Sequence, residues 1–160
     1  QEQKANNINL VTATHYVPQV VEALKIAKKN TTDLKLTGRV SCIQADALQP
    51  ASRFLGQFDL LISNPPYITA EEMRELEVSV RDYEPHLALD GGEDGLVFYR
   101  RIISEAKNHL RKNGVLMFEI GHDQAEEVSQ LIQETGAFTK VHVVKDLPGH
   151  DRVVYAEALY

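Results

Sequence analysis

The chain has 160 residues, of which 43% are hydrophobic and 25% charged, as expected for one soluble globular domain with a substantial core. It contains no apolar run near the ~20 residues that span a bilayer, and its polar first residues do not resemble a signal peptide. The net charge of −6 argues against a broad electrostatic contact with nucleic acid, which normally needs a basic face. Cys42 is the only cysteine, so no intrachain disulfide can form and a cytoplasmic setting is expected.

Hydrophobic periodicity predicts an alternation of strands and helices. Strands are expected at residues 8–14, 39–44, 58–63 and 115–120, with two more at the C-terminal end joined through Pro148-Gly149. Helices are expected from Val17 to about Asn30, over 70–78, from Phe98 to a stop at Asn113-Gly114, and from Ala125 to Ile132. Residues 81–95 hold one proline and three glycines and are expected to form an ordered loop. This order indicates a three-layer α/β fold, with a parallel sheet covered on both faces by helices in right-handed crossovers.

The most informative stretch follows the predicted strand at 58–63, where the chain reads Asn64-Pro65-Pro66-Tyr67. In such sheets, ligands bind beyond the carboxyl ends of the strands. A planar NH2 group is a poor nucleophile because its lone pair is delocalised. An Asn side-chain oxygen and a backbone carbonyl can accept its two N–H hydrogens and hold the nitrogen in line with an electrophile. The prolines would fix the direction of that carbonyl, and the aromatic ring can stack on the planar group.

The structural alternative for these four residues is a proline-stiffened turn with Tyr67 as a surface lid. Against it, the full motif resembles the acceptor site of methyltransferases that transfer a methyl group from S-adenosylmethionine to an amino or amide nitrogen of adenine, cytosine, guanine or glutamine. Residues 81–96 and the later stretches GVLMFEIGHDQAEEV and KDLPGHDRVVYA resemble the protein-glutamine methyltransferases that modify peptide-chain release factors. The resemblance covers roughly residues 10–160 and is most specific from Phe58 to Gly95.

This resemblance implies a Rossmann-like sheet with an antiparallel final strand and a release factor as the protein substrate. Asn64 and the Pro65 carbonyl would hold the glutamine amide, Pro66 and Tyr67 would shape its pocket, and Glu84-Pro85 would belong to the pocket wall. Without the resemblance, Glu84 reads as an ordinary loop carboxylate.

Several neighbouring residues have structural explanations. Gly91, Gly92 and Gly95 are expected to be turn residues with positive φ. Glu119, at the end of a strand, is read as structural and left out of the site. The six histidines show no ligand spacing, so no metal is expected.

The half of the site that would hold S-adenosylmethionine is only partly visible. No Gly-rich loop, which would let the backbone approach a nucleotide closely, occurs in the chain. The resemblance places residues 11–30 on the family's second strand and following helix. The family's first strand, its Gly-rich loop and its N-terminal helical domain therefore have no counterpart here, and residues 1–160 are expected to form a single, partial catalytic domain.

Four residues are candidates for contact with this cofactor. His15 falls where the resemblance implies a ribose-binding carboxylate, and a neutral His can make only one good hydrogen bond of that kind. Asp46, with Ala47 beside it, matches the carboxylate that faces the adenine amino group. An Asx turn at the end of a strand is the alternative for Asp46. Asn64 would lie between the cofactor and the acceptor group.

The unmatched strand would lie between the predicted strands at 8–14 and 58–63. Leaving its place open would leave buried backbone N–H and C=O groups without hydrogen-bond partners, at a cost of about 1–3 kcal/mol each. A typical domain stability is only about 5–15 kcal/mol. We therefore expect the place to be closed by direct pairing of the two flanking strands, or filled by another chain or by a segment outside these residues.

Three functions remain open from the sequence. The first is methylation of a release-factor glutamine. The second is methylation of a nucleic-acid amino group, which shares the motif but normally brings a basic recognition element that is not visible here. The third is a non-catalytic binding module that keeps the acceptor pocket without holding cofactor, which the missing Gly-rich loop and His15 favour. No direct contact with nucleic acid and none with a membrane is expected.

Overall fold

The computed structural model describes residues 8–12, 46–50, 56–76 and 86–160. Their centre is a five-stranded sheet in the order β1-β2-β3-β5-β4. The strands are β1 (Ile8–Thr12), β2 (Phe58–Asn64), β3 (Leu110–Glu119), β4 (His142–Lys145) and β5 (Asp151–Glu157). Strands β1, β2 and β3 run parallel, while β5 is antiparallel to both β3 and β4. The predicted parallel sheet with an antiparallel final strand is confirmed.

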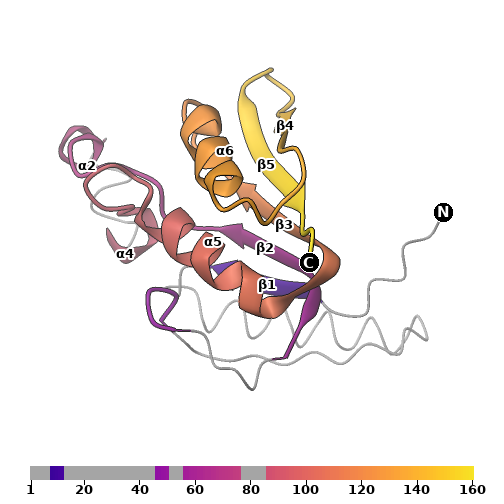
Figure 1. The fold of residues 1–160 in the computed structure, drawn as a ribbon. Helices are drawn as coiled ribbons and strands as arrows, with labels where there is room; N and C mark the ends of the chain where they lie inside the picture. The colour runs from indigo at the N-terminus through magenta and orange to yellow at the C-terminus, as the bar shows by residue number, and fades with distance from the viewer. Residues whose placement is uncertain (1–7, 13–45, 51–55, 77–85) are drawn as a thin grey trace, which may run out of the picture.

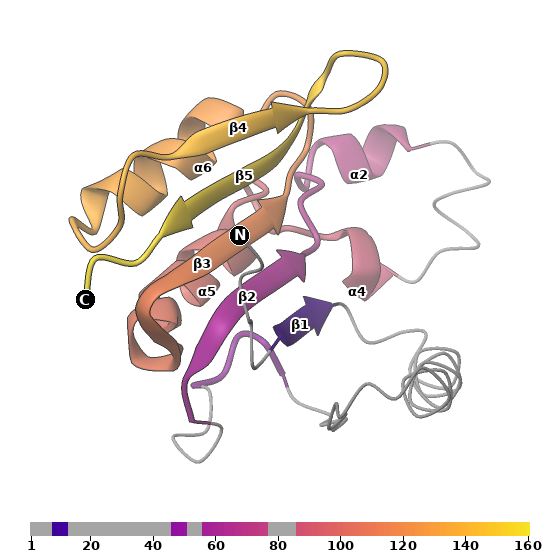
Figure 2. The ribbon, with the colours of Figure 1, turned by 90° about the vertical axis from the view of Figure 1, so that its right-hand side faces the viewer.

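Helices α5 (Val97–His109) and α6 (Ala125–Glu134) cover one face of this sheet, and Figure 2 shows both behind it. Each follows a parallel strand, as expected of crossover connections. Buried Tyr99, Ile102, Ile103 and Ala106 recur along α5 at helical spacing, so one stripe of the helix faces the sheet. The helix expected from Val17, which would contribute to covering the sheet, lies outside the described residues, as does the strand expected at 39–44.

The core lies between these two helices and the inner strands. Its fully buried members include Leu116 and Phe118 of β3, Val128 and Ile132 of α6, and Val154 of β5. The Tyr99 ring meets the Phe118 ring edge to face at 5.2 Å, which is a favoured arrangement for buried aromatic pairs. Helix α5 thus packs against β3, while α6 packs against β5 and α5.

Direct pairing closes the place of the unmatched strand. Strands β1 and β2 are hydrogen-bonded neighbours, with Ile8 opposite Leu60 and Thr12 opposite Asn64. Of the three arrangements expected from the sequence, the structure has direct pairing of the two flanking strands. Pairing satisfies the backbone groups that an empty position would leave stranded.

Strand β3 begins earlier than the sequence indicated. The helix was expected to run on to Asn113-Gly114 and the strand to begin at 115, but α5 ends at His109 and Leu110 is already extended. Leu110 pairs with Phe58 and Val115 with Leu60, so residues 111–114 bulge out of the ladder. Asn113 adopts φ 61° there, and a Cβ on Gly114 would lie 3.1 Å from the Phe58 carbonyl oxygen. The Asn-Gly pair marks a β-bulge rather than the end of a helix.

Two short helices also differ from expectation. Helix α2 covers Glu72–Glu75 rather than 70–78, of which 77 and 78 lie outside the described residues. Thr69 and Glu72 form a capping box, in which the Thr69 backbone N–H donates to Glu72 Oε2 at 2.8 Å and the Glu72 N–H donates to Thr69 Oγ1 at 3.2 Å. Within the expected loop at 81–95, residues His86–Leu89 form helix α4. The C-terminal strands, joined through Pro148-Gly149, are confirmed.

Replacing Leu116 with alanine should lower the free energy of unfolding by about 2–5 kcal/mol, because its side chain is fully buried and its loss leaves a cavity. Leu147→Ala is the matched control, since Leu147 is fully exposed at the tip of the β4–β5 hairpin. Urea denaturation of the two variants measures the difference. Equal losses would contradict this account of the core.

Candidate active site

The motif Asn64-Pro65-Pro66-Tyr67 lies at the carboxyl edge of the sheet. Asn64 is the last residue of β2, where it is exposed and sits opposite Thr12 of β1. Pro65 and Pro66 are buried, and the partly buried Tyr67 packs against the core. Figure 2 shows β1, β2 and β3 ending on the same side of the molecule, near α2 and α4. The amide side chain is therefore presented to solvent from a loop with a buried backbone.

Residues 65–70, which follow Asn64 and include the rest of the motif, are named the acceptor loop here. It is held against the segment 89–92 by a short ladder. The Ile68 N–H donates to the Leu89 carbonyl at 3.0 Å, and the Gly91 N–H donates back to the Ile68 carbonyl at 2.8 Å. The Ala70 N–H donates to the Gly92 carbonyl at 3.0 Å. Segment 89–92 thus acts as a short parallel partner for the loop, bridging Ile68 to Asp90.

The Tyr67 carbonyl is bound by Gln124, the residue that precedes α6. Gln124 Nε2 donates to the Tyr67 oxygen at 3.1 Å and lies 3.4 Å from the Gly95 oxygen, while its Oε1 accepts the Gly121 N–H at 3.1 Å. One carboxamide therefore joins the acceptor loop, the 91–95 loop and the end of β3. The sequence reasoning missed Gln124. Its signal was a polar side chain just after a buried strand, at the edge where the acceptor motif lies.

The glycines of the 91–95 loop permit this close packing. Gly92 and Gly95 have φ of 89° and 72°, as expected, but Gly91 does not have a positive φ, which corrects that part of the prediction. Gly91 is needed for a different reason: a Cβ there would lie 2.7 Å from Tyr67 Cα. At Gly95, a Cβ would lie 2.4 Å from the Tyr67 oxygen and 2.7 Å from Gln124 Nε2. Bare backbone at these positions lets the loop seat against Tyr67.

A rigid hairpin stands beside the same sheet edge. Asp146 accepts the backbone N–H groups of Gly149 and His150 at 3.0 and 2.8 Å, and its other oxygen accepts Arg152 Nη2 at 3.2 Å. Arg152 Nη1 donates to the carbonyl of Ile120, just beyond β3, at 3.1 Å. The hydrogen bond with Asp146 raises the pKa of Arg152, and the nearby Tyr67 and Glu119 add to the rise. The guanidinium is therefore a fixed positive charge next to the end of β3.

Tyr99 ties α5 to the same strand end. Its hydroxyl donates to the Glu119 carbonyl at 3.0 Å, and burial raises the pKa of this hydroxyl, with Tyr67 and Glu119 adding to the rise. The hydroxyl thus stays protonated and serves as a donor. Glu119 contributes its backbone carbonyl to this contact.

Asp46 forms the Asx turn that was the alternative to a ligand role. Its Oδ1 accepts the Leu48 N–H at 2.9 Å, and its carbonyl accepts the Gln49 N–H at 3.1 Å. The residue is exposed and Ala47 is partly buried. His15, Glu84 and Pro85 lie outside the described residues. The structure therefore places the acceptor motif and Asp46, and leaves the remaining predicted contacts as predictions.

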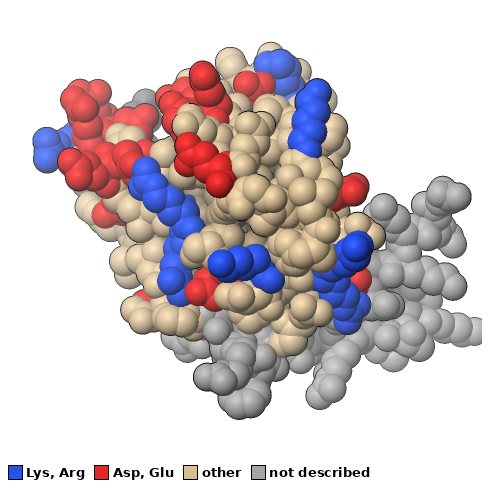
Figure 3. Space-filling model, in the orientation of Figure 1, with Lys and Arg blue, Asp and Glu red and all other residues tan. Residues whose placement is uncertain are grey.

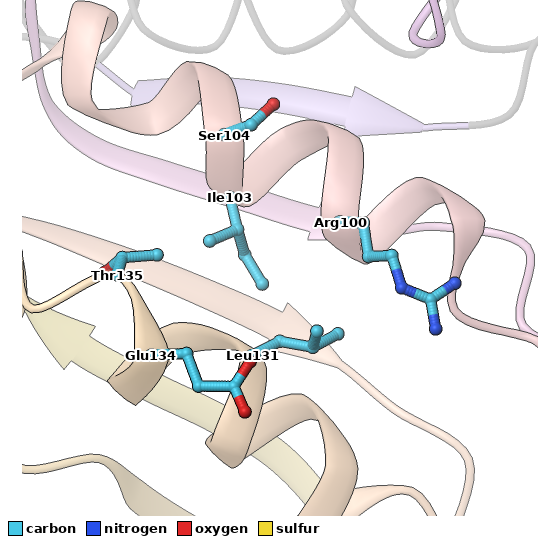
Figure 4. Close-up of a pocket in the computed structure, with 6 residues that line it drawn as sticks. All are labelled: Arg100, Ile103, Ser104, Leu131, Glu134 and Thr135. Atoms are coloured by element: carbon cyan, nitrogen blue, oxygen red, sulfur yellow. The ribbon is translucent and has the colours of Figure 1, made fainter.

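A separate hollow of about 260 Å³ lies between α5 and α6 (Figure 4). It is lined by Arg100, Ile103, Ser104, Leu131, Glu134 and Thr135, none of which was predicted for the site. Arg100 at its rim is ion-paired with Asp94, a hydrogen bond that lowers the pKa of Asp94. The hollow offers no further polar group arranged like those of the acceptor loop. No group of metal-ligating side chains occurs among the described residues, and no helix among them is long and apolar enough to cross a membrane.

Gly95→Ala should destabilise the protein by about 1–3 kcal/mol more than Gly136→Ala, because it forces a methyl group into the Tyr67 carbonyl and Gln124. Gly136 is the matched control: its φ of 62° imposes similar backbone strain, but a Cβ there meets nothing within 4 Å. Urea denaturation compares the two. If both variants lose the same free energy, the packing around Tyr67 is looser than the structure indicates.

Several proteins of similar sequence are described as release factor glutamine methyltransferases. The release factor glutamine methyltransferase of Clostridium acetobutylicum is 43% identical over 135 residues, which is 84% of this chain and 47% of that protein. That of Bacillus cereus is 41% identical over 151 residues, 94% of this chain and 52% of that protein. That of Caulobacter vibrioides is 44% identical over 133 residues. The chain spans about half the length of these relatives. No family model matches it.

Solved structures place the fold in the same group. The protein-(glutamine-N5) methyltransferase (release factor-specific) of Alicyclobacillus acidocaldarius superposes with a TM-score of 0.52 at 26% identity, over 96% of this chain and 79% of that one. A methyltransferase from Pyrococcus furiosus, at 16% identity and a TM-score of 0.51 over 96% of this chain and 62% of that one, shares the fold alone. The sheet is thus the Rossmann-like sheet of methyltransferases. Over most of its length the chain is therefore similar to about half the length of the release factor glutamine methyltransferases.

Proposed function

We propose that the protein takes part in the methylation of a glutamine side-chain amide in a peptide-chain release factor, with S-adenosylmethionine as the methyl donor. The observation that carries this proposal is the acceptor loop: an exposed Asn64 at the carboxyl end of β2, followed by two buried prolines and a Tyr67 fixed through its carbonyl. Relatives at 41–44% identity that bear the name release factor glutamine methyltransferase support the choice of substrate.

The acceptor loop suits an amide nitrogen because that nitrogen needs positioning more than it needs a base. The Asn64 side-chain oxygen accepts one N–H of the glutamine amide and the Pro65 carbonyl accepts the other, which leaves the nitrogen facing the donor. Pro66 keeps the carbonyl direction fixed, and Tyr67 lines the pocket that receives the planar amide. Once the nitrogen is alkylated its proton becomes acidic and leaves to solvent without a dedicated base.

The described residues fit the methyl donor in part. S-adenosylmethionine supplies a methyl carbon on a positively charged sulfur, which becomes a neutral thioether when that carbon bonds to the amide nitrogen. Asp46 keeps one carboxylate oxygen beyond its Asx turn for the adenine amino group, with Ala47 beside it, and Asn64 lies at the acceptor end. His15 at the ribose, and Glu84-Pro85 at the pocket wall, complete the set that we assign to this site in the whole protein.

The charge distribution fits a protein substrate better than nucleic acid. On the face shown in Figure 3, acidic side chains gather around α2, while basic side chains form a short run over α5 and lie as separate groups elsewhere. Glu71, just before α2, and Glu72 and Glu75 within it are exposed acidic residues that follow the acceptor loop directly. A nucleic-acid methyltransferase would bring its phosphate-binding basic surface to this edge.

One observation favours a second candidate, a non-catalytic module that keeps the acceptor pocket. Strand β1 pairs directly with β2, so these residues fold without the strand that in the family's sheet precedes the Gly-rich loop. Calorimetric titration with S-adenosylmethionine separates the two candidates, because only the enzyme binds it.

The substrate class is tested with radiolabelled S-adenosylmethionine and the whole protein. We expect label on release factor and none on DNA or RNA oligonucleotides. Replacing the acceptor glutamine of the release factor with asparagine should abolish the signal, because the shorter side chain cannot reach the Asn64 oxygen and Pro65 carbonyl together. Label on nucleic acid alone would move the assignment to nucleic-acid amino methylation.

Asn64→Ala should lower turnover on the order of 10²-fold or more, because it removes one of the two acceptors that orient the amide. Thermal unfolding should change little, since the Asn64 side chain is exposed. Asn108→Ala, at an exposed position of α5, is the control and should retain wild-type turnover. Near-wild-type activity of Asn64→Ala would refute the acceptor role.

A further inference from the structure

The carboxamide of Gln124 has its orientation fixed by its neighbours. Its Oε1 accepts the Gly121 N–H, so its NH2 group must face the carbonyl oxygens of Tyr67 and Gly95. The two assignments of nitrogen and oxygen are therefore not equivalent here, because the reverse would place Oε1 against two carbonyls. Gln124 is partly buried, where such repulsion is not relieved by water.

This contact lies between two consecutive prolines and the ladder that pairs the acceptor loop with segment 89–92. Pro65 and Pro66 carry no backbone N–H, so two consecutive residues cannot donate a hydrogen bond. Upstream, the strand pairing ends with Asn64 opposite Thr12. Downstream, the Tyr67 carbonyl accepts a hydrogen bond from Gln124, and the Ile68 N–H donates one to the Leu89 carbonyl. Gln124 thus binds the peptide group between Tyr67 and Ile68, one residue beyond the two prolines.

We propose that Gln124 is a positioning residue for the methyl transfer: by binding the Tyr67 carbonyl it fixes the direction in which Asn64 and the Pro65 carbonyl meet the acceptor amide. This inference rests on the proposed function for its catalytic consequence, while the clamp itself is a property of the fold. Gln124 acts through the acceptor loop and does not touch the substrate. Replacing Gln124 should change the orientation of the Asn64 side chain and the Pro65 carbonyl rather than the binding of S-adenosylmethionine.

Gln124→Glu is the most informative substitution because it changes charge and donors at constant shape. One carboxylate oxygen can still accept the Gly121 N–H, but the other faces the Tyr67 and Gly95 carbonyls. Both donated hydrogen bonds are replaced by repulsion. Protonation of the Glu restores one donor, so the defect should shrink as the pH falls. Gln124→Met keeps the length and removes the hydrogen bonds without adding repulsion.

Gln133→Glu is the matched control. Gln133 lies near the other end of α6, is exposed, and undergoes the same chemical change away from the acceptor loop. It should have wild-type turnover and wild-type exchange of the loop amides.

The first measurement is hydrogen exchange of the backbone amides, which requires no activity. In Gln124→Glu the Ile68, Ala70 and Gly91 amides, which hold the loop against segment 89–92, should exchange on the order of tenfold faster or more. Amides in the middle of β3 should be unchanged. Unchanged exchange of the three loop amides would overturn the clamp, whatever the protein methylates.

The second measurement is the kinetics of the whole protein with its release factor. For Gln124→Glu, kcat should fall by about tenfold or more, while KM for the release factor changes less than about threefold and cofactor affinity stays constant. The kcat relative to wild type should recover as the pH is lowered from about 8 to about 5.5, as the Glu gains a proton. The kcat of Gln124→Met should lie between those of wild type and Gln124→Glu, and it should not recover as the pH is lowered.

The outcomes separate this inference from the proposed function. If wild-type protein methylates release factor and the Gln124 variants keep its kcat, the positioning role is wrong and the function stands. If wild-type protein methylates nothing, the proposed function fails, and the exchange data still decide whether Gln124 clamps the loop. A kcat loss of equal size in Gln124→Glu at every pH would also overturn the role, because it would reflect general damage to the fold.

Discussion

The acceptor loop contains two consecutive residues without a backbone N–H, and much of the structure around it answers that constraint. At these two positions the loop has no backbone donor, so it is held there by packing and, just beyond them, by hydrogen bonds at Tyr67 and Ile68. The Tyr67 carbonyl takes its hydrogen bond from Gln124. The prolines themselves are buried, so their rings resist displacement. The two prolines remove two hydrogen-bond donors but restrict the backbone of the loop. A restricted backbone keeps its carbonyls in fixed directions, as a site that accepts hydrogen bonds from a substrate amide requires.

The elements around the loop are shaped by the same need. Gly91 and Gly95 bring bare backbone against Tyr67, at distances that leave no room for a Cβ. Strand β3 delivers Gly121 and Gln124 to the edge, and the hairpin beyond it fixes the end of β3 through the bond from Arg152 to Ile120. Direct pairing of β1 with β2 supports the loop from the other side, up to Asn64. The geometry of the acceptor loop therefore depends on β1, β2, β3 and the β4–β5 hairpin together.

The sequence was a good guide wherever one strong pattern decided the local structure. The apolar run before Asn64, the helical stripe of α5 and the Pro148-Gly149 hairpin each formed as predicted. It was a poor guide where tertiary contacts decided. Gly91 is glycine for space and not for its φ, which no local pattern reveals. The Asn113-Gly114 pair reads as a helix stop, yet it serves a bulge because Leu110 is drawn into the ladder with Phe58. Gln124 has no motif, and only its partners across the chain disclose its role.

The hydrogen bond from Gln124 to Tyr67 spans 57 residues of sequence, and the contact with Gly95 spans 29. The carboxamide meets its carbonyls only where β2 and β3 lie side by side and the chain turns into α6. The sheet does not depend on this contact in return, because its strands are held by their own ladders. Local opening of the loop would therefore abolish its ability to orient an amide while the secondary structure still stands.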